Sequence, residues 1–190
     1  MTKVCIVRHG ETDWNALGKF QGLEDIELND SGRRQALNSS QYLKKHNWDA
    51  IISSPLSRAR QTAEIIGGVV GLTQVDIMQE FIERDLGSAS GLLPAERKRR
   101  FPNGHIPDAE PRPVLEARIT NALKNVEDQY NNKNVIVVTH GGIINSIMLK
   151  LTKGEFNPET TPIKNGSVTI LNLNNYVWDL ELFNYTEKIK

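Results

Sequence analysis

Short apolar runs alternate with segments of helical period along this chain, and this alternation constrains the fold more than any other feature. The runs VCIV at 4–7, DAIISS at 49–54 and NVIVVTH at 134–140 are short and rich in β-branched residues, as buried strands are. A further short strand is expected around Val75 and Ile77. Buried strands that alternate with helices favour a parallel sheet covered on both faces.

Helical periods and a terminal hairpin complete this pattern. Asn174 and Asn175 separate two strand-like runs at 167–173 and 177–183, which favours a closing antiparallel hairpin. Helices are predicted at residues 31–45, 57–67, 113–130 and 141–151, with Gly67 and Gly68 expected to end the second. We therefore expect an α/β fold, a three-layer α/β/α arrangement with a mainly parallel central sheet.

The stretch from Arg84 to Arg112 interrupts the alternation. It holds Gly and Pro at intervals with little sustained periodicity, so we expect a short lid insertion containing one short helix. The basic run RKRR at 97–100 is typical of a solvated face. With 190 residues, 38% of them apolar, the chain is predicted to form one domain over 1–190 with this lid at about 84–112.

Charge and cysteine content argue against several classes of partner. Lys plus Arg equals Asp plus Glu at 23 each, so no basic field favours nucleic acid. Cys5 is the only cysteine, so one chain can form neither a disulfide nor a cysteine-based zinc site. No apolar stretch approaches the ~20 residues that span a bilayer, and no leader pattern is present. We expect a cytoplasmic protein with a small partner, without nucleic acid or membrane.

Cationic side chains follow three of the predicted strands at the point where each strand ends. Arg8 and His9 end the first strand, Arg58 lies just after the second, and His140 ends the third. Ligands of open α/β sheets bind beyond the carboxyl ends of the strands. Gly141 begins the next helix, where exposed backbone N–H groups favour an anion. Guanidinium groups match phosphate oxygens and an imidazole can attack phosphorus, so the pattern predicts a phosphate site.

A plainer interpretation applies to most single residues of these types. An Arg-His pair after a strand is usually an incidental polar turn, and His46 and His105 keep that interpretation. His9 and His140 differ because each follows a core-like strand and precedes Gly. Arg58 is expected in the first turn of a helix, where the helix dipole opposes a cation, so a negative ligand should compensate it.

Four segments together carry a family resemblance. They read RHGETDWN at 8–15, LNDSGRRQA at 28–36, SSPLSRARQTA at 53–63 and VVTHGG at 137–142. In their order and spacing they resemble the successive signatures of the histidine phosphatase superfamily, the phosphoglycerate mutase-like group. The resemblance covers nearly the whole chain.

The resemblance implies a mechanism with named residues. His9 would attack phosphorus and become a phosphohistidine, while Arg8, Arg58 and His140 would hold the equatorial oxygens. It also implies that no metal and no cofactor is needed.

Four further residues complete the implied phosphate and substrate pocket. Asn15 and the backbone N–H of Gly141 would line the phosphate pocket. The segment that matches Gln21 and Gly22 would contact the substrate.

The resemblance also implies a proton donor. In the family a Glu protonates the leaving group, and FIERDLG at 81–87 aligns Glu83 with it, with Glu80 and Asp85 as nearby candidates. The family segment usually continues with Trp and Glu where this chain has Ala89 and Ser90. This departure bears on substrate preference.

Three functions follow from these residues. The primary expectation is a phosphatase that hydrolyses the phosphate monoesters of small molecules. The chain lacks the additional segments with which mutases of this family hold a carboxylated sugar phosphate. A cofactor-dependent phosphoglycerate mutase and a non-catalytic phosphate-binding regulatory module are the alternatives. The exposed edge of the closing hairpin also offers a surface for a homodimer.

Overall fold

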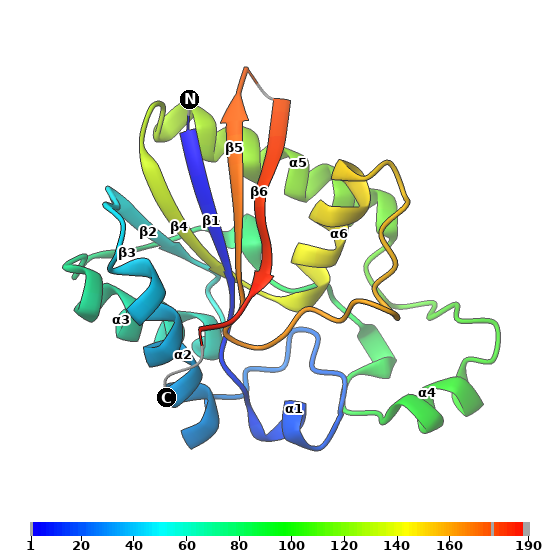
Figure 1. Ribbon diagram of the computed structural model, residues 1–190. Helices are drawn as coiled ribbons and strands as arrows, with labels where there is room; N and C mark the ends of the chain where they lie inside the picture. The colour runs from blue at the N-terminus through cyan, green and yellow to red at the C-terminus, as the bar shows by residue number, and fades with distance from the viewer. Residues whose placement is uncertain (1, 176, 188–190) are drawn as a thin grey trace.

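The structure is a computed structural model that describes residues 2–175 and 177–187. Its strands form one six-stranded sheet in the order β3-β2-β4-β1-β5-β6, with helices on both faces (Figure 1). The strands are β1 (Thr2–Arg8), β2 (Ala50–Ser53), β3 (Val75–Ile77), β4 (Asn134–Thr139), β5 (Val168–Asn174) and β6 (Val177–Tyr185). The helices are α1 (Asp13–Ala16), α2 (Asp30–Leu43), α3 (Ser57–Val70), α4 (Pro94–Arg100), α5 (Arg112–Gln129) and α6 (Gly141–Leu151), with short 3₁₀ helices η1 (Gln79–Phe81) and η2 (Gly87–Ala89).

The sheet is mainly parallel, as the sequence predicts. β1 pairs in parallel with β4, β4 with β2, and β2 with β3, whereas β5 runs antiparallel to β1 and to β6. The carboxyl ends of β1, β2 and β4 therefore meet at one edge of the sheet. The three-layer α/β fold with its antiparallel closing hairpin is confirmed.

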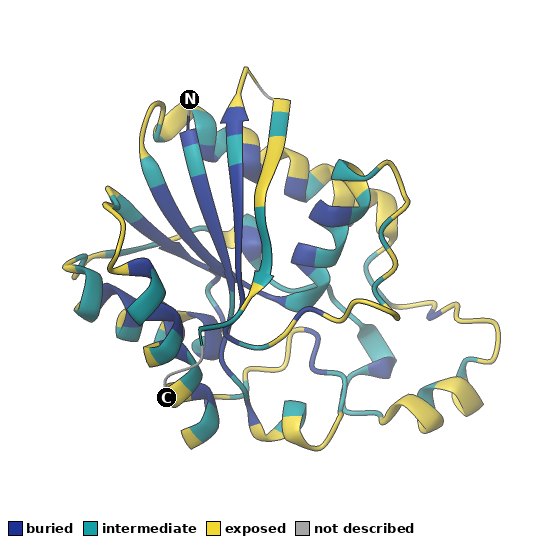
Figure 2. Ribbon diagram, in the orientation of Figure 1, coloured by how far each residue is buried: buried dark blue, intermediate teal, exposed yellow. Residues whose placement is uncertain are grey.

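The two faces of the sheet bury different side chains of the same strands. Val4 and Ile6 belong to the core under α5 and α6, while Cys5 and Val7 belong to the core under α2 and α3. Successive side chains of a strand point to opposite faces, so a continuous apolar run fills both cores. Figure 2 shows the buried strands between partly exposed helices.

The expected end of the second predicted helix is wrong. α3 continues through Gly67 and Gly68 to Val70, and Gly71 caps it in the left-handed conformation at φ +83°. Gly67 serves a different purpose, because a Cβ there would overlap the carbonyl oxygen of Leu72. The Leu72 N–H in turn donates to the Gly67 carbonyl at 2.8 Å. Close packing, rather than helix termination, explains this glycine.

Residues 84–112, the predicted lid, contain one short α-helix, α4, in addition to η2. Lys98, Arg99 and Arg100 of the basic run are exposed, and Arg97 is half-buried. The run therefore lies outside the core, and α4 projects to one side of the sheet (Figure 1). Within residues 2–175 and 177–187, no helix is long and apolar enough to cross a membrane.

Two glycines allow the loop after β1 to lie directly against the start of α2. A Cβ on Gly32 would stand 2.7 Å from the backbone nitrogen of Glu11 and overlap its carbonyl oxygen. A Cβ on Gly10 would likewise stand 2.7 Å from the carbonyl carbon of Gly32. The Asn29 side chain caps α2 by accepting the Gly32 N–H at 2.8 Å. The start of α2 thus supports the segment that follows His9.

Gly32→Ala should lower the free energy of unfolding by about 1–3 kcal/mol, because the new methyl group meets backbone that cannot move aside alone. Gly68→Ala is the matched control: it lies in a helix, and nothing stands within 4 Å of its new Cβ. It should stabilise the protein by about 0.5–1 kcal/mol. Urea unfolding followed by circular dichroism measures both, and an unchanged stability in Gly32→Ala would contradict the close approach.

Candidate active site

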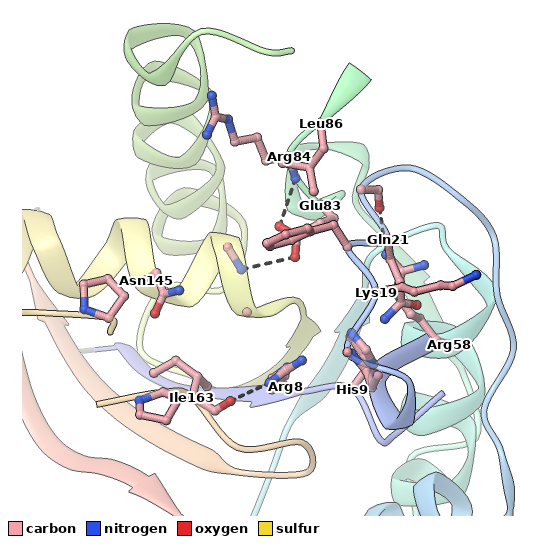
Figure 3. Close-up of a pocket in the computed structure, with 18 of the residues that line it drawn as sticks. Arg8, His9, Lys19, Gln21, Arg58, Glu83, Arg84, Leu86, Asn145 and Ile163 are labelled. Atoms are coloured by element: carbon pink, nitrogen blue, oxygen red, sulfur yellow. Dashed lines mark hydrogen bonds between the residues drawn. The ribbon is translucent and has the colours of Figure 1, made fainter. Parts of the chain in front are cut away.

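The ends of β1 and β4 bring two imidazoles together. Arg8 pairs with Thr139 in the parallel register, so His9 and His140 follow at adjacent positions, and their ring centroids lie 5.1 Å apart. His9 lines a cavity of about 450 Å³ that is open to solvent (Figure 3), whereas His140 does not line it but directly precedes Gly141, which does. Of the predicted site residues, this cavity is lined by Arg8, His9, Asn15, Gln21, Gly22, Arg58, Glu83 and Gly141.

His9 is held in one tautomer. Its Nδ1 lies 2.6 Å from the carbonyl oxygen of Gly10. A carbonyl only accepts hydrogen bonds, so Nδ1 carries the proton and Nε2 keeps its lone pair. Thr62 fixes this turn, because its hydroxyl accepts the Gly10 N–H at 3.0 Å. Burial, followed by the charges of Arg58 and Arg8, holds the pKa of His9 well below its usual 6.5. The ring therefore favours the neutral form, with the lone pair of Nε2 free.

Arg58 is a buried cation in the first turn of α3. Its Nη1 donates to the Glu24 carbonyl at 2.6 Å and its Nη2 to the Gly22 carbonyl at 2.9 Å. Its Nε is buried without a hydrogen-bond partner among the described residues. Burial lowers the pKa of Arg58 to about 10, against the opposing charges of Glu83 and Asp25. A guanidinium at this pKa remains charged at neutral pH.

Arg8 repeats this arrangement from β1. Its Nη1 donates to the carbonyl oxygen of Ile163, in the loop before β5. Its Nε is buried and also has no partner within the part of the chain that the structure describes. Burial lowers its pKa, while the charge of Glu83 raises it. Two buried guanidinium groups with unused N–H donors beside one cavity form a site for an anion.

His140 is fully buried, and Ser54 holds its ring. Its Nε2 is 2.7 Å from the Ser54 hydroxyl, and its Nδ1 is buried without a partner among the described residues. Burial, then the charges of Arg58, His9 and Arg8, keep its pKa well below 6.5. Ser54 is a site residue that was not predicted from the sequence. Its place directly after a buried strand, at the edge where the cations meet, was the available signal.

Glu83 is the carboxylate at the cavity. Its Oε2 accepts the N–H of Gly142 at 3.1 Å and its Oε1 accepts the N–H of Arg84 at 2.9 Å (Figure 3). A Cβ on Gly142 would overlap the Glu83 Oε1, so a larger residue there would displace this carboxylate. The carboxylate of Asp85 instead accepts the Gly87 N–H at 2.8 Å, and that of Glu80 lies 3.4 Å from Asn125. Neither Asp85 nor Glu80 is among the residues that line the cavity.

The predicted substrate-binding residues Asn15 and Gln21 line the cavity, and hydrogen bonds fix their side-chain amides. The Asn15 Oδ1 accepts hydrogen bonds from the backbone N–H of Thr12 and from Asn165 Nδ2, each at 3.2 Å. The Gln21 Oε1 accepts from the Thr12 hydroxyl at 3.0 Å. With its oxygen engaged in this way, each amide leaves its nitrogen as the donor for a ligand.

Further cations stand around the mouth of the cavity. Lys19, Arg84 and Arg97 line it, and the Arg97 guanidinium lies 5.0 Å from the centre of the Phe20 ring. Lys19 and Arg84 were not predicted as site residues. In residues 2–175 and 177–187, no three His, Cys, Asp or Glu side chains lie together as metal ligands would. The positive charge at this cavity is supplied by the side chains themselves.

The two depressed imidazole pKa values make stability depend on pH. Below pH 6.5 the unfolded chain binds more protons than the folded one, so the free energy of unfolding should fall as pH decreases. Each histidine contributes at most about 1.4 kcal/mol per pH unit. Urea unfolding measures the free energy of unfolding at pH 6.5 and 5.5. Between these two pH values it should fall less for His140→Gln than for the wild type. The control His105→Gln changes an exposed residue, and its free energy of unfolding should fall as much as that of the wild type. An equal fall in all three proteins would contradict the lowered pKa of His140.

Comparisons with known proteins agree with this geometry. The uncharacterised phosphatase PhoE of Bacillus subtilis is 39% identical over 184 residues, which cover 97% of this chain and 95% of that one. Phosphoglycerate mutase-like protein 4 of Arabidopsis thaliana is 37% identical, over 76% of this chain and 69% of its own. A histidine-to-alanine mutant of phosphoserine phosphatase from Entamoeba histolytica, solved with phosphoserine, superimposes with a TM-score of 0.83 at 30% identity, covering 97% of each chain.

A family model adds the decisive observation. The model described as the histidine phosphatase superfamily, branch 1, matches residues 4–186, from the first core strand to the last residues of the sheet and beyond. The four sequence signatures and the paired imidazoles lie within this range. The chain therefore belongs to the histidine phosphatase superfamily.

Proposed function

We propose that this protein is a phosphatase that hydrolyses phosphate monoesters through a phosphohistidine on His9. The single observation that carries the proposal is the neutral His9 Nε2 beside buried guanidinium groups with unused N–H donors. A nucleophile and preorganised positive charge are the two requirements of phosphoryl transfer. Membership of the family and the similarity to PhoE support it.

The proposed reaction has two steps. In the first, His9 Nε2 forms a bond to phosphorus as the ester P–O bond breaks, and Glu83 gives its proton to the leaving oxygen. In the second, water attacks phosphorus, Glu83 takes a proton from that water, and the P–N bond breaks to release inorganic phosphate. Arg8, Arg58 and His140 stabilise the phosphoryl oxygens in both steps. Asn15 and the Gly141 N–H complete that pocket.

The positive rim of the cavity favours a substrate whose leaving group carries a negative charge, such as a carboxylate. Lys19, Arg84 and Arg97 add positive charge outside the phosphate pocket, beside Gln21 and Gly22. The phosphoserine held by the Entamoeba histolytica structure is a molecule of this class, a small phosphate monoester with a carboxylate. Small phosphorylated acids are therefore the substrates that we propose to screen first.

A mutase is the alternative, because several relatives carry a mutase or mutase-like name. Incubation with 3-phosphoglycerate separates the two activities. A phosphatase releases inorganic phosphate, whereas a mutase gives an isomeric phosphoglycerate and depends on a bisphosphorylated primer. Four expectations remain predictions from the sequence. They are a cytoplasmic location, a homodimer through the edge strand β6, a lid at 84–112, and activity without a metal or cofactor.

Quenching turnover with alkaline denaturant should trap phosphate on His9 in the wild-type enzyme, because the P–N bond of phosphohistidine is stable in base but hydrolyses in acid. His9→Ala should lose the label and about 10⁴-fold or more in kcat, because it removes the nucleophile of a two-step mechanism. Phosphopeptide mapping and inorganic phosphate release are the measurements. His105→Ala, the same change at an exposed lid residue, should retain both. An active, unlabelled His9→Ala enzyme would refute the mechanism.

Glu83→Gln should harm alkyl esters far more than aryl esters. A general acid contributes about 10²- to 10⁴-fold, and the contribution grows with the basicity of the leaving group. An alkyl phosphate expels a strongly basic alkoxide, whereas p-nitrophenyl phosphate expels a stable phenolate. Rapid-quench measurement of phosphohistidine formation compares the two substrates. Equal losses for both esters, or the same signature in the control Glu80→Gln, would move the proton donor elsewhere.

A further inference from the structure

Arg118 lies outside the cavity but binds the backbone on the N-terminal side of Glu83. Its Nη1 donates to the carbonyl oxygens of Glu80 at 2.7 Å and Ile82 at 2.8 Å. Its Nε and Nη2 form a bidentate pair with the Glu110 carboxylate at 3.0 and 2.8 Å. The Arg118 and Glu110 side chains are only 19% and 14% exposed. All three guanidinium nitrogens are thus used by the protein itself.

Glu110 extends this connection to the C-terminal side of Glu83. Its backbone N–H donates to the Asp85 carbonyl at 2.9 Å, and its own carbonyl accepts the Arg84 Nε at 2.9 Å. Residues 80 and 82 are therefore bound by Arg118, and residues 84 and 85 by Glu110. The Arg118–Glu110 pair brackets Glu83 on both sides.

The segment that carries Glu83 has little other support. Residues 82–86 lie between η1 and η2 and form no regular secondary structure. Phe81 is anchored, because it is buried and its carbonyl accepts the Thr139 hydroxyl at 2.8 Å. Beyond Phe81 the backbone is held by the Arg118 side chain at Ile82 and by the backbone N–H of Glu110 at Asp85. Ile119, next to Arg118 on α5, is buried in the core, which makes this helix a rigid base.

We infer that Arg118 and Glu110 are positioning residues that hold the Glu83 carboxylate within reach of the leaving oxygen. The inference rests on the proposed function, in which Glu83 transfers the proton. Proton transfer requires hydrogen-bond distance between the acid and the leaving oxygen, about 2.6–3.2 Å. A shift of the 82–85 backbone moves the carboxylate but leaves the phosphate pocket of Arg8 and Arg58 in place. Loss of the pair should therefore reproduce the Glu83 defect in a milder form.

The test uses Arg118→Gln and Glu110→Gln, with Arg118→Lys as the conservative variant. We expect kcat/KM for an alkyl phosphate to fall about 10- to 100-fold, a part of the full general-acid contribution. With p-nitrophenyl phosphate the loss should stay below about threefold, because its leaving group needs no acid. Inhibition by vanadate should be unchanged. Arg118→Lys should recover part of the activity, since one ammonium can replace some of these donors but not the planar fork.

A double-mutant cycle separates positioning from simple destabilisation. Arg118→Gln in a Glu83→Gln background should cost almost nothing further with the alkyl ester, because the acid it positions is already absent. Arg60→Gln, which breaks an exposed ion pair with Glu64, is the control and should leave both substrates unaffected. All assays are run at a temperature at which urea curves show the variants to be folded. If Arg118→Gln does not fold, the same measurements are made with Glu110→Gln in its place.

The outcomes distinguish this inference from the proposed function. Equal losses for both esters, or additive losses in the double variant, would overturn the positioning role while Glu83→Gln still shows its leaving-group signature. If Glu83→Gln itself lacks that signature, the proposed proton donor fails and the positioning role fails with it.

Discussion

The parallel pairing of β1 with β4 is the constraint on which the rest of the site depends. It places Arg8 opposite Thr139, so the residues that follow, His9 and His140, leave the sheet side by side. A register shift of one residue would turn the alternating side chains of one strand to the other face and separate the imidazoles. The apolar residues that fill both cores therefore also determine the spacing of the site. Stability and function share one hydrophobic pattern.

The two arginines of the cavity are held by backbone carbonyls rather than by direct ion pairs with carboxylates. Arg8 and Arg58 donate to backbone carbonyls of Ile163, Glu24 and Gly22, which orient the guanidinium groups but leave them charged. Neither arginine belongs to an ion pair among the residues that the structure describes. Buried charges without a counterion reduce stability. Such an arrangement is expected where an anionic ligand supplies the missing charge.

The sequence predicts the sheet, the cores and much of the site because these depend on local patterns. VCIV and NVIVVTH identify β1 and β4, and the basic residues at their ends mark the edge where the cavity lies. Gly67 was misread as a helix end, because its close approach to Leu72 depends on how the chain turns after α3. Ser54 beneath His140 escaped prediction for a similar reason. A hydrogen bond between residues 86 positions apart leaves no periodic signal.

In the proposed reaction, the unused N–H donors of Arg8 and Arg58 affect product release as well as substrate binding. Inorganic phosphate, the product, presents the same tetrahedral oxygens as the substrate and satisfies the same buried donors. Its departure restores two unpaired N–H groups to a buried position, which costs free energy. Release of the product is thus opposed by the feature that attracts the substrate.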